Sequence, residues 1–227
     1  MTEKPIFGKT WNTAAVTVIV DKMADVIIEN EVHFCDMDSV AGDGDFGMSI
    51  AKGFRQLKKD WATRDKSDVG AFLKSAGEII MEYCGGASGP IWGSAFRGAG
   101  KSAAGKKEIG LSDLAELMQA AVTAIQDTGK RSFGRGAVVG DKTLIDALVP
   151  TADTLTDAAK KGEGLAVAVK KGADAAVQGA ENTKKIVAHM GRAGTVGERS
   201  IGHPDAGAYG LGVIFTALAA FVAEKSK

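Results

Sequence analysis

The stretch Asp38-Ser-Val-Ala-Gly-Asp43-Gly-Asp45-Phe-Gly47 places three aspartates and three glycines within ten residues. It separates two segments with helical periodicity, so it predicts a loop between two helices. Glycine lets a backbone adopt positive φ and approach a ligand closely. Carboxylates are the hard oxygen ligands that Mg²⁺ requires. The loop therefore predicts a metal held by Asp38, Asp43 and Asp45, with phosphate close by.

Two other interpretations of this loop stay open on its spacing alone. The same residues are typical of a solvated turn and of a loop that binds structural calcium. An EF-hand does not fit, because a register that starts at Asp36 puts Val40 at an oxygen-ligand position and Gly47 where the closing glutamate belongs. The rest of the chain must decide between a metal–phosphate loop and a plain turn.

Composition and charge limit the class of protein. The chain has 227 residues, of which 45% are hydrophobic and 25% charged, as in an ordinary globular protein. Lys+Arg and Asp+Glu both number 28, and no basic block is present, so no nucleic-acid partner is expected. No apolar run approaches the roughly 20 residues that cross a bilayer, and the amino terminus lacks a signal-peptide core. We expect a cytoplasmic protein without a membrane partner, in which Cys35 and Cys84 are small buried residues.

The hydrophobic periodicity on both sides of the loop is helical almost throughout. It predicts about eight helices, and Pro150 is expected to interrupt one of them. No linker or change of composition divides the chain, so residues 1–227 are predicted to form one all-α domain. The predicted helices cover residues 11–31, a segment from about 47, 69–83, 90–104, 113–127, 142–148 with 154–161, 165–190 and a carboxy-terminal segment through Phe221.

Glycine-rich loops at residues 38–47, 85–89, 129–141 and 191–207 would converge at one end if successive helices run antiparallel. The loop with Ser88 could bind an anion at a helix amino end, or it could simply stop one helix before Pro90 starts the next. The Gly140–Thr143 segment is no P-loop, because no strand precedes it. It is either a helix cap or part of a site.

In the last loop, Arg192 suits a nucleotide phosphate, although Arg192, Arg199 and His203 could instead pair with Glu198 and Asp205.

Four motifs in this order, DSVAGDGDFG, GGASGPIWG, GDKTLIDALVP and GRAGTVGERSIGHPDAGA, span most of the chain. Together they closely resemble the nucleotide-binding DhaL subunit of dihydroxyacetone kinases, which is also the carboxy-terminal domain of single-chain ATP-dependent kinases. The resemblance implies an eight-helix antiparallel barrel that binds ADP or ATP at one end. Two Mg²⁺ would link the nucleotide to Asp38, Asp43 and Asp45.

The resemblance also implies the nucleotide contacts. They lie at the end of the metal loop and just after it, in the loop at residues 85–89, and in or next to the last two glycine-rich loops. Leu144 and Met48 would pack around the base or ribose. Carried over position by position, the contacts are Phe46, Gly47, Met48, Ser49, Ala87, Ser88, Gly134, Leu144, Arg192, Asp205, Ala206 and Gly207.

The sequence departs from the family at two of these positions. Phe46 stands where phosphoenolpyruvate-dependent members commonly have histidine, and Ala206 replaces the proline of the usual Asp-Pro-Gly. The donor therefore stays open between ATP and a phosphoenolpyruvate relay in which ADP remains bound. The acceptor stays open between dihydroxyacetone and a four-carbon ketose such as erythrulose.

The family divides its work between subunits. A separate DhaK-type subunit binds the ketose through a histidine, which His33, His189 and His203 of this chain do not replace, and a DhaM-type phosphocarrier serves the relay. The expected function is a kinase subunit. A nucleotide-loaded regulatory protein and a metal-dependent phosphatase are the alternatives, and a homodimer is left open.

Overall fold

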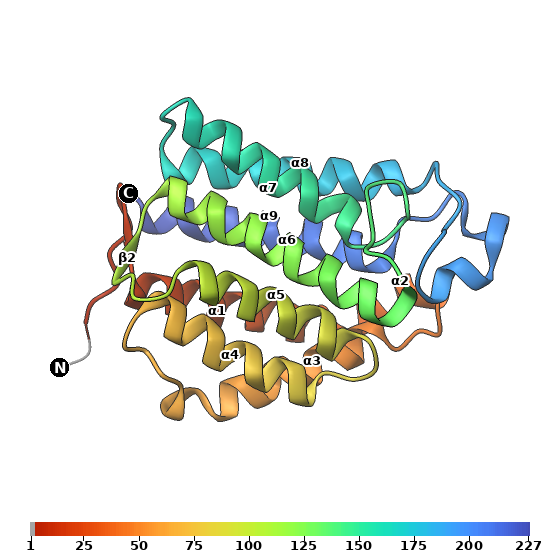
Figure 1. The fold of residues 1–227 in the computed structure, drawn as a ribbon, viewed down its shortest axis with the longest axis horizontal. Helices are drawn as coiled ribbons and strands as arrows, with labels where there is room; N and C mark the ends of the chain where they lie inside the picture. The colour runs from red at the N-terminus through yellow and green to blue at the C-terminus, as the bar shows by residue number, and fades with distance from the viewer. Residues whose placement is uncertain (1–2) are drawn as a thin grey trace.

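The computed structural model describes residues 3–227, and eight helices in this part of the chain form a closed ring (Figure 1). From α3 onward each helix packs against the next along the chain, and α1 closes the ring by contacting α3 and α9. A ninth helix, α2, extends the end of α1 beyond the ring. The predicted all-α barrel is confirmed. The helices are α1 Thr13–Glu29, α2 Glu31–Ser39, α3 Phe46–Lys59, α4 Val69–Tyr83, α5 Ser88–Ser102, α6 Leu111–Phe133, α7 Ile145–Lys160, α8 Leu165–Thr183 and α9 Ala206–Lys225.

Local sequence explains where several helices begin. The side chain of Asn12 accepts the Ala15 N–H at 3.0 Å before α1, and that of Asp68 accepts the Ala71 N–H at 2.8 Å before α4. The first predicted helix is shorter than expected, because the chain bends at Asn30 and continues as α2. The short strands β1 (Trp11–Asn12) and β2 (Glu108–Ile109) pair antiparallel and join the start of α1 to the α5–α6 connection.

Helix α7 runs through Pro150 without a break, which corrects the expected interruption there. Proline has no N–H, so the carbonyl of Asp146 four residues earlier loses its helical donor. Gly179 of α8 lies against this carbonyl, and a Cβ at Gly179 would be only 2.2 Å from the oxygen. Because Gly179 has no side chain, its Cα–H can approach this carbonyl and partly replace the missing N–H donor.

Helix α9 is the one helix in residues 3–227 that is long and apolar enough to cross a membrane, which corrects the expectation that no segment is. In the structure it is a helix of the ring, where it packs against α1, α7 and α8 and buries Leu211, Ile214 and Leu218. Two apolar cavities of about 130 and 150 Å³ lie inside the ring beside it. Its apolar composition therefore serves the barrel core.

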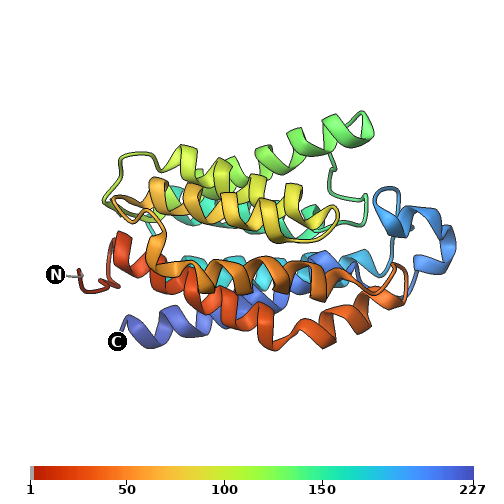
Figure 2. The same cartoon turned by 90° about the horizontal axis from the view of Figure 1, so that it is seen from below.

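The antiparallel order of the ring places every second connection at the same end. The α2–α3, α4–α5, α6–α7 and α8–α9 connections all lie at the end opposite the two termini, where the last of them forms the projecting blue segment (Figures 1 and 2). The glycine-rich loops of the sequence belong to these connections, so the fold gathers them as expected.

Candidate functional site

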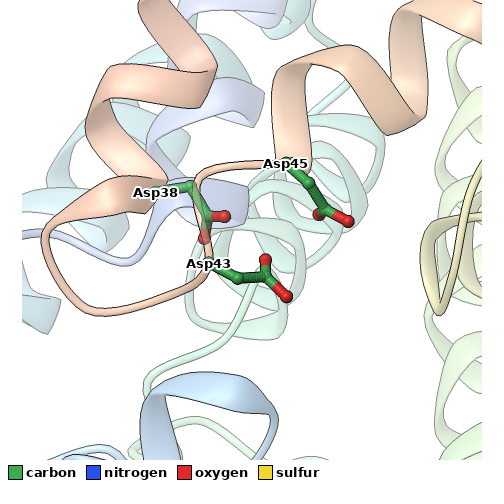
Figure 3. Close-up of side chains that lie close together, drawn as sticks. All are labelled: Asp38, Asp43 and Asp45. Atoms are coloured by element: carbon green, nitrogen blue, oxygen red, sulfur yellow. The ribbon is translucent and has the colours of Figure 1, made fainter.

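Three carboxylates meet where α2 passes into α3 (Figure 3). Asp38 lies in the last turn of α2, Asp43 in the connection, and Asp45 immediately before α3. One oxygen from each side chain lies within 4.8 Å of the oxygens of the other two. The structure thus brings together the three predicted metal ligands.

The glycines of the loop make this cluster possible. The Asp38 carboxylate accepts the Gly44 N–H at 2.9 Å, and the Asp38 carbonyl accepts the Gly42 N–H at 2.6 Å. A Cβ at Gly42 would lie 2.2 Å from an oxygen of Asp38, and Gly44 has a φ of +76°. A side chain at Gly42 would displace Asp38 from the cluster, and one at Gly44 would strain the left-handed backbone whose N–H donates to Asp38.

The electrostatics of the cluster suit a divalent cation. Partial burial and the negative charges of Asp43 and Asp38 raise the pKa of Asp45 above its usual range. This repulsion between carboxylates is relieved by a bound cation, and all of the side-chain donors are hard oxygens. The residues present therefore fit Mg²⁺.

A cavity of about 250 Å³ opens beside the three carboxylates and joins the four connections. Its wall includes the amino end of α5, the start of α7, the α8–α9 connection and the amino end of α9. Helix amino ends present free N–H groups and a positive dipole end to anions. The predicted site residues that line this cavity are Asp38, Asp43, Asp45, Phe46, Ala87, Ser88, Leu144, Arg192, Asp205, Ala206 and Gly207.

Arg192 reaches across the cavity mouth. Its Nη2 lies 2.7 Å from Oδ2 of Asp43, and 69% of its side chain is exposed. Among the alternatives left open for the last loop, the structure therefore shows an ion pair, but with the metal loop and not with Glu198 or Asp205. An exposed pair of this kind contributes little stability, so the guanidinium is free to turn toward a phosphate.

Four predicted contacts do not line this cavity. Gly47 packs against α2, where a Cβ would lie 1.9 Å from the Glu31 carbonyl oxygen. Met48 is 57% exposed on the outer side of α3. Ser49 is buried, and its carbonyl accepts the Gly85 N–H at 3.1 Å. Gly134 ends α6 with a φ of +78°. Their proposed nucleotide contacts stay predictions.

A second cavity, of about 240 Å³, adjoins the first. The two share Ala87, Ile91, Leu144 and Met190 in their walls. Phe133 lines the second cavity, and the neighbouring Gly134 marks the end of α6 beside it. Its largely apolar wall suits a flat ring system next to a polar, carboxylate-lined compartment.

Sequence reasoning missed several residues of the site, most notably Lys142. It lines the first cavity, yet it is only 1% exposed and has a φ of +61°, the one positive φ of a non-glycine residue in residues 3–227. The GDKT motif drew attention to this lysine, but no sequence pattern predicts the left-handed backbone that turns it inward. Met190 and Trp92 were also missed, because apolar side chains in the wall of a site look like core residues in the sequence.

Comparisons with known proteins agree with this geometry. The family model of the DAK2 domain matches residues 40–220. The PEP-dependent dihydroxyacetone kinase 2, ADP-binding subunit DhaL, of Listeria innocua is 33% identical over 191 residues, which cover 83% of this chain and 85% of that protein. The L-erythrulose 1-kinase of Mycolicibacterium smegmatis is 33% identical over 207 residues, 89% of this chain but only 34% of that kinase.

A solved structure shows the same fold. The dihydroxyacetone kinase from C. freundii in complex with AMP-PNP and Mg²⁺ superposes with a TM-score of 0.68 and 26% sequence identity, covering 97% of this chain and 35% of that chain. The chain therefore corresponds to one part of the single-chain kinases and to most of a stand-alone subunit. From the matched residues, the fold and the loop cluster, we conclude that this chain belongs to the DAK2 domain family and is similar to its DhaL-type members.

Proposed function

We propose that this chain, as one domain over residues 1–227, is the ADP- or ATP-binding subunit of a dihydroxyacetone kinase, a phosphotransferase. The observation that carries the proposal is the single cavity at which the carboxylate cluster, the α5 amino end, Arg192 and the α9 amino end meet. A DhaL-type relative of similar length is an ADP-binding subunit. A related kinase was solved with a nucleotide analogue and Mg²⁺.

The two cavities indicate how a nucleotide lies. The phosphates would occupy the polar cavity, where Arg192 and the amino end of α5, which no side chain caps, favour negative charge. The base would occupy the apolar cavity against Leu144 and Met190. Two Mg²⁺ held by Asp38, Asp43 and Asp45 would offset the charge of the phosphates.

No residue of this site has to act as a nucleophile, because phosphoryl transfer depends mainly on positioning and charge stabilisation. The chain's own residues bind and orient the nucleotide. The ketose would be held by a DhaK-type subunit docked at the loop end of the barrel. Exposed apolar side chains surround this end, among them Val40, Met48, Phe133 and Val139. We expect the complex to be cytoplasmic.

The donor and the acceptor define the alternatives. Phe46 lines the cavity and packs on Phe34 with ring centroids 5.9 Å apart, so it offers the nucleotide no polar group. A phosphoenolpyruvate relay through a DhaM-type protein would keep ADP bound, whereas direct use of ATP needs exchange. The likeness to an erythrulose kinase makes a four-carbon ketose the second acceptor to test.

Calorimetric titration with Mg·ADP tests the site. Asp43→Asn should weaken binding at least tenfold, about 1.4 kcal/mol, because it removes a charged ligand from the cluster. Asp36→Asn is the matched control, since Asp36 is an exposed aspartate of α2 that lies near the loop in sequence but outside the cluster. Equal affinities of the wild type and both variants would refute the metal assignment.

Reconstitution then separates the functional classes. The chain mixed with a DhaK-type subunit and dihydroxyacetone should release dihydroxyacetone phosphate with ATP, or with phosphoenolpyruvate and the phosphocarriers. A regulatory protein would bind Mg·ADP and show no turnover with either donor. Hydrolysis of a phosphate ester by the chain alone would instead support a phosphatase.

A further inference from the structure

The segment between α8 and α9, residues 184–205, carries Arg192 and reaches the turn at Asp205, yet it has almost no apolar core of its own. It contains two short 3₁₀ turns, Arg192–Thr195 and Gly197–Ser200. From residue 184 to residue 204, only Ala188 and Ser200 are buried. A segment with so little buried apolar surface needs polar contacts to hold one conformation.

Those contacts converge on Lys142. Its Nζ donates to the carbonyls of Thr183 at 2.8 Å, Ile186 at 3.2 Å, Ser200 at 2.6 Å and His203 at 2.7 Å. The four acceptors come from the end of α8, the chain just after it, and the stretch from Ser200 to His203 that leads back toward α9. One ammonium group therefore ties together both ends of the segment.

This geometry excludes a direct phosphate contact by Lys142. An ammonium has three N–H donors, and here four carbonyls share them, so no donor is left for a ligand. The side chain points beneath the segment, because the backbone of Lys142 adopts the left-handed conformation. Non-glycine residues seldom adopt it unless the surrounding structure enforces it.

The neighbouring hydrogen bonds hold the same segment in place. The Asp141 carbonyl accepts the His189 N–H at 3.1 Å, the Ser200 hydroxyl accepts the Ala188 N–H at 3.0 Å, and the Lys184 carbonyl accepts the Gly202 N–H at 2.8 Å. These bonds join the α6–α7 connection to the segment and fold it back on itself around the ammonium. They leave Arg192 at the outer edge, facing Asp43.

We propose that Lys142 is a positioning residue that holds residues 184–205, and with them Arg192 and the Asp205–Gly207 turn, against the nucleotide cavity. The proposal rests on the proposed nucleotide function for its ligand. The claim that Lys142 holds residues 184–205 in one conformation does not depend on the identity of the ligand. It assigns the lysine of the GDKT motif to the α8–α9 connection and not to the phosphates.

Two variants test the proposal by hydrogen exchange and by titration with Mg·ADP. Lys142→Met keeps the aliphatic stem and removes the ammonium, whereas Lys142→Gly suits the left-handed backbone and removes the whole side chain. Leu155→Ala changes a buried residue of α7 that lines neither of the two cavities of the candidate site. It is the control for a general loss of stability.

In both Lys142 variants, the amides of Ala188, His189 and Gly202 should exchange at least tenfold faster, and the Kd for Mg·ADP should rise at least tenfold. Amides of α1 and α4 should change only as they do in Leu155→Ala. Wild-type exchange in residues 184–205 together with wild-type affinity, in either folded variant, would overturn the proposal.

A measurement on the wild type keeps the test decisive if both variants fail to fold. Acetic anhydride should modify Lys142 at least a hundredfold more slowly than exposed Lys185, at a rate that follows the exchange of the Gly202 amide. Modification of Lys142 as fast as that of Lys185 would refute the proposal that Lys142 is a buried positioning residue. If the wild type itself does not bind Mg·ADP, the nucleotide function fails, while exchange and labelling still decide the function of Lys142.

Discussion

At the scale of single residues, the two cysteines have very different surroundings. Cys84 is buried where α4 ends, and its Sγ lies 3.6 Å from the carbonyl oxygen of Ile50. Burial raises the pKa of the Cys84 thiol to about 12. Cys35, on α2, is only half-buried. The expectation that both are small buried residues therefore holds for Cys84 alone.

This difference predicts selective thiol chemistry. At pH 8 only roughly one Cys84 thiol in ten thousand would be ionised, so a thiol reagent should modify Cys35 first and Cys84 only after unfolding. Raising the pH from 7 to 9 should not make the Cys84 thiol reactive, because its pKa lies well above this range. The reaction is followed with a chromogenic disulfide in native and denatured protein.

Cys35→Ser is the control, since it should abolish the rapid native reaction. Two thiols that react at one rate in the folded protein would contradict the burial of Cys84.

At the scale of elements, close approach of helices depends on glycines at their contacts. Gly47, in the first turn of α3, lies against the first half of α2, and a Cβ there would be 1.9 Å from the Glu31 carbonyl oxygen and 2.9 Å from the Cys35 nitrogen. Both neighbours are backbone atoms, which cannot rotate away.

Gly47→Ala should therefore lower the free energy of unfolding by about 1–3 kcal/mol, because α2 and α3 must move apart. Urea denaturation measures this loss. Gly8→Ala is the matched control, since no atom lies within 4 Å of a Cβ at Gly8, and it should change stability by less than about 0.5 kcal/mol. A Gly47→Ala protein as stable as Gly8→Ala would show that the helices do not pack as closely as described.

At the scale of the whole molecule, the site joins segments from nearly the full length of the chain. The metal loop, α5, α7 and α9 each contribute to one cavity, so a ligand there links four connections of the ring. A ligand that binds only the folded state stabilises it by mass action. The barrel as a whole should respond to the nucleotide.

Mg·ADP at about 100 times its Kd should raise the free energy of unfolding by about 2.7 kcal/mol. For a chain of this size, such a change corresponds to a rise in Tm of roughly 5–10 °C. Thermal denaturation followed by circular dichroism measures it. ADP with a chelator should give a much smaller rise, and Asp43→Asn should remove most of the effect of Mg²⁺. An equal rise with and without Mg²⁺ would argue against the carboxylate cluster as a metal site.

Much of the fold was predictable because it depends on local patterns. Helical periodicity marked the positions of the ring helices, and the predicted range 69–83 coincides with α4. The composition of the Asp/Gly loop predicted the carboxylate cluster. The chemistry of arginine pointed to Arg192 in the last loop, and the resemblance to the DhaL family supplied the Asp205–Gly207 turn. The structure places both at the cavity.

The sequence by itself thus determined where the ring helices lie, which loops are rich in glycine and aspartate, and to which family the chain belongs. It did not determine that α2 forms a separate helix or that α8 ends at Thr183, short of the predicted residue 190. Only the tertiary structure decided that α7 continues through Pro150, that Met48 faces outward, and that Lys142 points beneath the α8–α9 connection. The physical reason is the range of the interactions. Periodicity and capping act between residues a few positions apart. The approach of Gly179 to the carbonyl that Pro150 leaves without a donor, and the burial of an ammonium among carbonyls as far away as His203, exist only once distant segments pack together.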